Sequence, residues 1–383
     1  MGFRFANASI PALAVIAASA CSSSTDATGA KTSAPSTLAD AAAPDSGTGG
    51  LAPSQLANGC PVNSGYLGDA MCLAAPATTS GFQLHYGPAS YSDAAGEAPY
   101  LLQPGEEIND CYYEKTSNTA DEYIGGFDFQ MRPGSHHIIM NVNPTGQPDG
   151  FATCGANDQA PGLLYSSQTP TYDMQNDPAP ENQGLAVKLL ANSQAVINFH
   201  VINTTSKPIL REAWLNYFYI DPSQVKGIRG NVFLVGGLGY QITPGTKQTY
   251  QYSCSPTRPT RILTLAAHMH AHSSRMTVWK VSAGQPTMVY ESYSWENPVG
   301  FSYDSVHTNP APDRATQTPG ASSGQLTLQP TDTLQWECAV DNTSSNTLTF
   351  RNEVYTGEMC IVGGTMVPAD DPMNPYDFTC TRN

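Results

Sequence analysis

The residues of this chain best suited to chemistry are its histidines, because they are few and they occur in groups. Of the eight histidines, five fall into three settings: His136-His137, a single His200, and the pair His268 and His270. Imidazole is a good ligand for zinc and copper, so this grouping indicates a metal site. The other histidines are interpreted as ordinary surface or hydrogen-bonded residues: His85, His272 and His307.

Strand geometry decides which histidines can meet at one ion. Residues two apart in a strand project to the same face, so His268 and His270 can share an ion, and His270 with His272 is possible on the same grounds. Adjacent His136 and His137 should point to opposite faces. They can meet only if the chain bends or the strand begins there, and residues 133–134, Pro-Gly, favour a bend.

The kind of metal follows from the softer donors. Met359, in the sequence Thr-Gly-Glu-Met-Cys at 356–360, is a candidate thioether ligand, and thioethers select copper. No C-x-x-C occurs, and cysteines of an exported chain are expected to be in disulfides. Copper is therefore favoured over a thiolate zinc site.

The N-terminal 59 residues predict export and tethering. Arg4 precedes an apolar stretch from Ala8 to Ala20, which is typical of a signal peptide and too short to span a bilayer. Residues 18–21, Ala-Ser-Ala-Cys, form a relaxed lipoprotein box in which Cys21 is lipidated; ordinary cleavage at a small-x-small site is the alternative. Residues 22–59 are mostly Ala, Gly, Ser, Thr and Pro, as in a disordered tether. We expect a lipid anchor in the cell envelope, on the periplasmic or the surface face of the outer membrane.

Composition and patterning predict an all-β protein of two domains. A formal charge of −15 from 17 basic and 32 acidic residues leaves no basic surface for nucleic acid or anionic lipid. From residue 60 onward, apolar residues alternate in short runs such as 195–201 and 261–265, and Pro-Gly turns separate them. The alternation predicts β-sandwiches, with an N-terminal domain over 60–245 and a C-terminal domain over 246–383.

The order and spacing of these residues resemble the copper type II, ascorbate-dependent monooxygenases, the family of peptidylglycine α-hydroxylating monooxygenase and dopamine β-monooxygenase. The resemblance spans about residues 105–380 and identifies the chain as a bacterial lipoprotein member. It implies a first copper on His136, His137 and His200. It implies a second, catalytic copper on His268, His270 and Met359, which favours the 268/270 pair over 270/272.

The resemblance also implies a fold and a set of disulfides. The fold is two tandem jelly-roll-like sandwiches that carry one copper each and face one another across a solvent-filled cleft. The family's bridges match Cys111–Cys154, Cys254–Cys380 and Cys338–Cys360, which leaves Cys60 and Cys72 to pair with each other and Cys21 for lipid.

The activity implied is hydroxylation of a substrate C–H bond with dioxygen and ascorbate or another one-electron reductant. The first copper would store and relay an electron, and the second would bind dioxygen. The family's carboxylate-binding Arg is Ala266 here, its Asn and Tyr after the ligand Met are Ile361 and Gly363, and a loop Gly is Ser273. The small-molecule or peptide substrate is therefore not identified.

Two other functions fit the same residues. One is a non-enzymatic copper-binding or storage protein on this scaffold. The other is a β-sandwich module that binds an envelope component and uses its histidines structurally. The aromatic segment 290–303, with Trp295, is expected to line the space beside the second copper.

Overall fold

A computed structural model gives the fold. The structure describes residues 60, 62–91, 94–143, 147–154, 163–167, 171–173, 177–236, 239, 241–369 and 378–382. The predicted signal peptide, the lipidation site Cys21 and the tether lie outside the described residues.

The prediction of an all-β protein is confirmed. Strands form nearly all the regular structure, and the described residues include a single short α-helix, α1 (Ala94–Glu97). β22 (Thr333–Asp341) shows why the segments become strands, since every second side chain is buried, from Leu334 to Val340. β10 (Gln194–Ile202) is buried along its whole length because both of its faces are covered: one lies in the core of the sandwich, and Val196 on the other packs against Cys111 and Tyr113.

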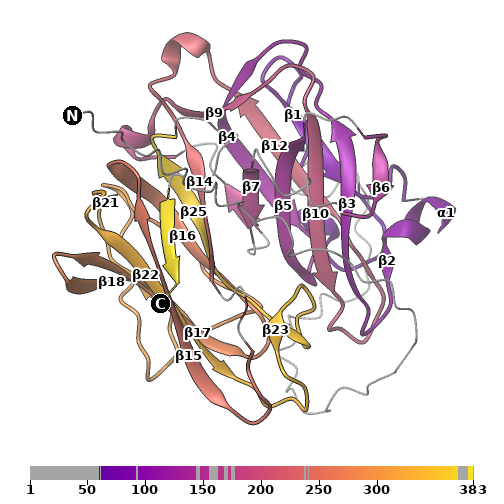
Figure 1. The fold of residues 1–383 in the computed structure, drawn as a ribbon. Coiled ribbons are helices and arrows are strands. Elements are labelled where there is room, and N and C mark those ends of the chain that lie inside the picture. Colours follow the sequence, from indigo (N-terminus) through magenta and orange to yellow (C-terminus); the bar gives the residue numbers. More distant parts are fainter. Residues whose placement is uncertain are drawn as a thin grey trace, which may run out of the picture.

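The first sandwich contains two sheets around one core (Figure 1). One sheet has the order β1 (Gly81–Tyr86), β12 (Ala213–Tyr219), β4 (Glu122–Met131), β9 (Leu185–Leu189) and β13 (Gly227–Ile228), with β8 (Thr171–Asp173) also on β4. The other has the order β6 (Gly150–Ala152), β3 (Glu107–Lys115), β10, β5 (Ser135–Asn143) and β7 (Leu163–Ser167). A small pair, β2 (Leu101–Leu102) with β11 (Ile209–Leu210), completes this half.

The second sandwich repeats the plan around its own core. One sheet has the order β14 (Gly230–Gly236), β25 (Cys360–Val367), β16 (Thr260–Met269) and β19 (Phe301–Ser302), with β21 (Leu326–Leu328) also on β16. The other has the order β20 (Gly320–Ala321), β18 (Gln285–Ser292), β17 (Ser273–Ser282), β22, β15 (Lys247–Pro256) and β26 (Phe378–Arg382). A parallel pair, β23 (Thr349–Phe350) with β24 (Gly357–Glu358), lies beside them.

Strand pairing changes from one sandwich to the other at Arg229, earlier than the boundary expected after Gly245. β13 pairs with β9 of the first half, whereas β14 pairs with β25 of the second. Figure 1 shows β14 beside β25. Local sequence favoured the later boundary because a Pro-Gly turn follows at 244–245, and the partner of β14 lies more than a hundred residues away.

The described residues contain four disulfides, and they are the four pairs expected: Cys60–Cys72, Cys111–Cys154, Cys254–Cys380 and Cys338–Cys360. Cys338–Cys360 joins β22 to β25 and so ties together the two sheets of the second sandwich. All eight cysteines that the structure describes are oxidised.

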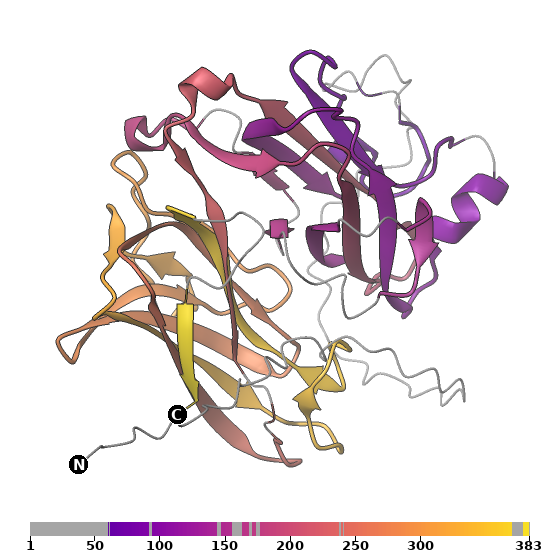
Figure 2. The ribbon, with the colours of Figure 1, turned by 45° about the horizontal axis from the view of Figure 1, so that its top comes forward.

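The two sandwiches lie side by side (Figure 2), and polar side chains join them. The carboxylate of Glu181, in the first half, accepts hydrogen bonds from the backbone N and Oγ of Ser305 at 2.6 and 2.7 Å and from Nε2 of Gln325 at 2.9 Å. Arg261 donates to Oδ1 of Asn182 at 2.8 Å. These contacts fix the docking of the two halves at one end of their interface.

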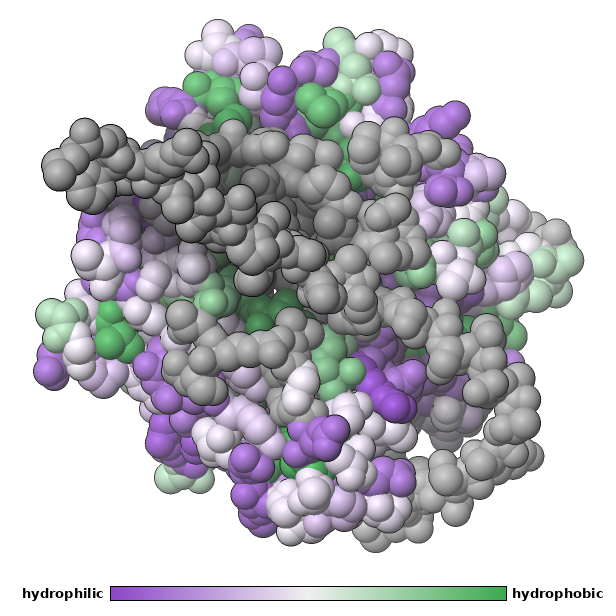
Figure 3. All heavy atoms as spheres, in the orientation of Figure 1, coloured by the Kyte–Doolittle hydropathy of each residue, from purple (hydrophilic) through white to green (hydrophobic). Residues whose placement is uncertain are grey.

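On the face drawn in Figure 3, the coloured surface is mostly hydrophilic, and hydrophobic residues form small separate groups. Among the described residues, no helix has the length and apolar character needed to span a bilayer.

Candidate metal centre

A β-bulge places the first three histidines together. His200 on β10 pairs with His137 on β5, and the next residue, Val201, pairs with Ser135, so His136 is an extra residue in β5. A bulge re-aims side chains that would otherwise alternate. It supplies the bend that adjacent histidines need, and the ring centroids of His136 and His137 lie 5.0 and 4.9 Å from that of His200.

Strand alternation places the second pair. In β16, Ala267 and Met269 point into the core of the second sandwich, and His268 lies on the opposite face. His270 follows directly after the strand and is fully buried. The ring centroids of His268 and His270 are 5.3 Å apart.

The five histidines form one cluster across the two halves. The His136 ring lies 5.0 Å from the His268 ring and 5.4 Å from the His270 ring, and the His137 ring lies 5.0 Å from the His268 ring. These separations equal those within each group. The expectation of two sites separated by a solvent-filled cleft is therefore not what the structure has. The cleft was implied by the resemblance alone, and no local pattern reports how two sandwiches dock.

Two sets of ligand atoms are close enough to hold a metal ion. They are His136, His137 and His200, and His136, His268 and His270; within each set all the ligand atoms lie within 4.8 Å of one another. His136 belongs to both. The histidine donors fit zinc or copper, which both accept imidazole nitrogen.

The environment keeps the imidazoles neutral. Burial, followed by repulsion from neighbouring histidines, lowers the pKa of His136, His137, His268 and His270 well below 6.5. Metal ions bind the neutral form of histidine, so the cluster is ready to bind a metal at neutral pH.

Hydrogen bonds orient two of the rings. Nε2 of His200 donates to Oε1 of Glu107 at 2.8 Å, and Nε2 of His137 donates to Oδ1 of Asn198 at 3.3 Å. Nδ2 of Asn198 donates to Asn109 at 2.8 Å, which turns its oxygen toward His137. Among the described residues, Nδ1 of His137 and of His200 has no hydrogen-bond partner. In this tautomer Nδ1 carries the lone pair that a metal requires.

Met359 lies between β24 and β25 and is buried. Cys360 pairs with Met269 and Ile361 pairs with His268, and the paired stretch of the two strands ends at Met269 and Cys360. Opposed residues of antiparallel strands share a face. Ile361 therefore shares the face of His268, and alternation places Met359, two residues before Ile361, on this histidine face, opposite the core-facing Cys360.

Glu358 holds the backbone at this point. Its Oε1 accepts from the backbone N of His270 at 2.8 Å and of Met359 at 2.9 Å, so one carboxylate oxygen joins two candidate ligands. Burial raises the pKa of Glu358 to about 7, while backbone hydrogen bonds oppose the shift.

The remaining histidines stay outside the cluster. Nε2 of His272 contacts the backbone O of Tyr355 at 2.9 Å, so it does not join His270 in a ligand pair. His307 pairs with Asp304, and His85 pairs with Glu212 and stacks on Trp214. These contacts match the interpretation of all three as ordinary hydrogen-bonded residues.

One residue of the expected aromatic lining lies at the cluster. The Trp295 ring is 5.8 Å from the His136 ring and 5.9 Å from that of Tyr355, which is 44% exposed. Tyr290, by contrast, is buried in the core of the second sandwich. The segment therefore contributes a single aromatic ring next to the histidines rather than a continuous wall.

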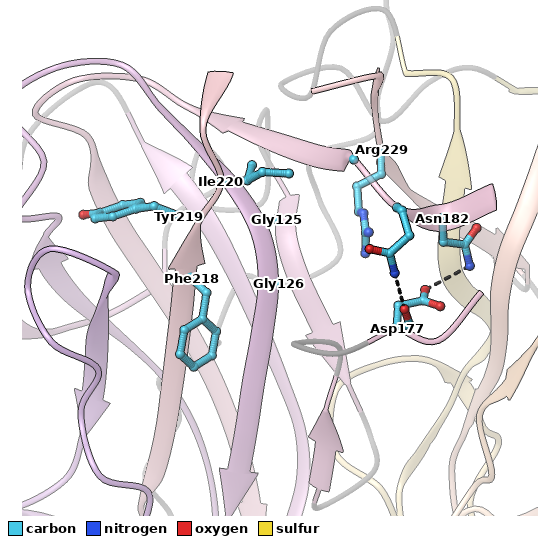
Figure 4. A pocket seen from close by; sticks show the side chains of 10 residues that line it. Gly125, Gly126, Asp177, Asn182, Phe218, Tyr219, Ile220 and Arg229 are labelled. Carbon is cyan, nitrogen blue, oxygen red and sulfur yellow. Dashed lines mark hydrogen bonds between the residues drawn. The ribbon is translucent and has the colours of Figure 1, made fainter. Parts of the chain in front are cut away.

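The pocket in Figure 4 is elsewhere, and none of the candidate ligands lines it. Its wall combines glycines with Arg229 and Asp177, at the point where the chain passes between the sandwiches. Arg229 is held there by a hydrogen bond to the backbone O of Leu185 at 3.3 Å. We assign this pocket no part in the metal centre.

Sequence reasoning identified all five clustered histidines but missed the residues that orient them. Glu107 and Asn198 carry no local signal, because their contacts with His200 and His137 depend on strand register. Glu358 does have a signal, since it directly precedes Met359. No protein-family model matches the chain, and no curated protein matches it. Fold and site define a class nonetheless: an all-β, disulfide-linked protein of two sandwiches, with a buried histidine cluster that could hold metal.

Proposed function

We propose that the protein is an exported copper-dependent monooxygenase that hydroxylates a C–H bond of an organic substrate with dioxygen and an external reductant. The observation that carries the proposal is the cluster of five histidines, drawn from both halves of the chain. Their order along the sequence is the one that the resemblance to the ascorbate-dependent monooxygenases is based on.

The donor set supports copper. All eight cysteines in the described part of the chain are in disulfides, so they offer no thiolate for zinc. Met359, on the histidine face, adds a thioether that favours Cu(I). The four disulfides also support an oxidising compartment outside the cytoplasm, in line with the proposed lipid anchor at Cys21.

Bound copper would supply one-electron redox chemistry with dioxygen. The chain itself contributes neutral imidazoles, hydrogen bonds that set their tautomers, and exclusion of water. His200, His270 and His136 are 0, 0 and 2% exposed. Such burial would protect a reactive centre from solvent.

The residues beside His268 disfavour a substrate that carries a carboxylate. Ala266 and Gly363 are paired across β16 and β25, and Ile361 pairs with His268. These three positions carry no cation that could hold a carboxylate. The protein's acidic charge likewise disfavours an anionic substrate.

A second function, non-enzymatic copper binding or storage, is favoured by the same burial. A stored metal ion needs only a narrow path to the histidines, whereas an organic substrate needs a wider one. Of the five histidines, only His268 is partly exposed.

Copper analysis and turnover measurements test the proposal together. The monooxygenase should bind copper and consume oxygen in the presence of ascorbate and substrate, with one hydroxylated product per oxygen. His268→Ala should abolish this coupling, and His307→Ala, at an exposed histidine outside the cluster, should not. Bound copper with no product across a broad substrate panel would support storage. Failure to bind copper would exclude both functions.

A further inference from the structure

We propose that His136, His268 and His270 form a metal site shared by the two sandwiches, and that an ion bound there joins the halves. This goes beyond the proposed function, because it requires no oxygen chemistry and no copper. It concerns the same histidines, but it groups His136 with His268 and His270 of the other half.

The geometry supports the shared set as well as the set within the first half. The ligand atoms of His136, His268 and His270 lie within 4.8 Å of one another, the same limit that His136, His137 and His200 meet. The His136 ring is 5.0 Å from the His268 ring, and it is also 5.0 Å from the His200 ring. An ion therefore finds His136 equally placed toward either half.

His136 cannot complete both sets at once. A neutral imidazole has one nitrogen with a free lone pair, and the other nitrogen carries the proton. Because the two sets share this residue, they are linked: occupation of one removes a ligand from the other. Two independent sites, one in each sandwich, would show no such linkage.

The halves are held in position for a shared site by contacts that need no metal. Oε1 of Glu107, in β3, accepts from the backbone N of Val354 in the second half at 3.0 Å. The backbone O of Val354 accepts from N of Ala271, next to His270, at 3.2 Å. This chain of hydrogen bonds runs from the partner of His200 to the segment that carries His270, so the ligands on the two halves are positioned relative to each other.

Three imidazoles with a fourth position for water form a set that Zn²⁺ accepts. Zinc is the appropriate probe because it has no redox chemistry, so the result does not depend on the monooxygenase proposal. The key variant is the double substitution His137→Ala/His200→Ala, which removes two ligands of the first-half set and keeps all three of the shared set.

Zinc titration by calorimetry should show one Zn²⁺ per chain for this double variant. Adding His136→Ala should weaken that binding by at least tenfold. His307→Ala, at an exposed histidine paired with Asp304, is the matched control and should leave zinc binding unchanged. If His136→Ala leaves zinc binding of the double variant unchanged, the shared site does not exist.

Two further measurements test the proposal even if the variant that also carries His136→Ala fails to fold. X-ray absorption on the zinc-loaded double variant should count three imidazoles, and a count of two would overturn the proposal. Urea unfolding should report the joining of the halves, since Trp214 is in the first sandwich and the other tryptophans are in the second. Zinc bound by both halves should raise the urea midpoint reported by Trp214 and the midpoint reported by the other tryptophans. Zinc bound by the second half alone would raise only the midpoint reported by the other tryptophans.

Discussion

Glu107 and His200 are joined by a hydrogen bond of 2.8 Å between Oε1 and Nε2, and the same oxygen also accepts from the backbone N of Val354. A carboxylate at the far nitrogen of a histidine fixes the ring and its tautomer, and its loss typically lowers metal affinity about 10- to 100-fold. Here the same carboxylate also connects the two sandwiches, because Val354 belongs to the second one.

Glu107→Ala should therefore have two effects. Metal affinity should fall about 10- to 100-fold, as measured by calorimetry with Zn²⁺ or by competition for copper. The amide of Val354 should exchange faster with deuterium in the metal-free protein, because its acceptor is gone. Glu107→Gln keeps an oxygen acceptor and should restore much of the protection.

The neighbouring residue provides the control. The side-chain carboxylate of Glu106 accepts from the backbone N of Gln103 within its own turn, so Glu106→Ala removes the same charge without removing a contact to the histidines or to Val354. If both alanine variants behave alike, the effect of Glu107 is one of net charge and the proposed role is wrong.

Met359→Leu should remove the sulfur and keep the packing. We expect about a tenfold or greater loss of Cu(I) affinity and the disappearance of copper–sulfur scattering in X-ray absorption, because the thioether is a soft donor. Met269→Leu is the matched control, since Met269 adjoins His268 but points into the core. Copper–sulfur scattering that survives Met359→Leu would remove Met359 from the ligand set.

Local patterns predicted much of the fold, and contacts between distant segments account for the rest. Alternation of side-chain type predicted the strands around His200 and His268, because successive residues of a strand point to opposite faces. The pairing of β14 with β25 could not be read in this way. Each strand contains a short apolar run, Val-Phe-Leu-Val in β14 and Cys-Ile-Val in β25, and such runs do not identify a pairing partner.

The candidate site could likewise be predicted only in part from local sequence. Histidine type and spacing were visible in sequence, and so was the need for a bend at His136. The merging of two histidine groups into one cluster was not, because it depends on how two separately folded sandwiches dock. The contact of Glu107 with His200 likewise depends on the register of β3 against β10.

Removal of the Cys338–Cys360 disulfide should affect both stability and the centre. Its loop spans 22 residues and that of Cys60–Cys72 spans 12, so the loss of either bridge should lower the free energy of unfolding by about 3 kcal/mol. Cys360 adjoins Met359, so the Cys338→Ser/Cys360→Ser variant should also lose Cu(I) affinity. Cys60→Ser/Cys72→Ser should lose stability only, as measured by urea unfolding and Cu(I) competition. Equal Cu(I) affinities in the two variants would contradict this positional role.

Acid should weaken the contact between the sandwiches through Glu181. Hydrogen bonds from Ser305 and Gln325 lower the pKa of this carboxyl from 4.5 to about 2. The folded protein therefore keeps the carboxylate ionised at pH values where the unfolded chain protonates it, and the stabilisation is present above about pH 4.5 and is lost as the pH falls toward 2. Glu181→Gln should lower the urea midpoint at pH 7, and the difference from the unmodified protein should shrink between about pH 4.5 and 2. Glu296→Gln, at an exposed carboxylate outside this contact, should show no such pH-dependent difference. A Glu181→Gln deficit that stays constant down to about pH 2 would mean that the hydrogen bonds of Glu181 do not depend on its charge.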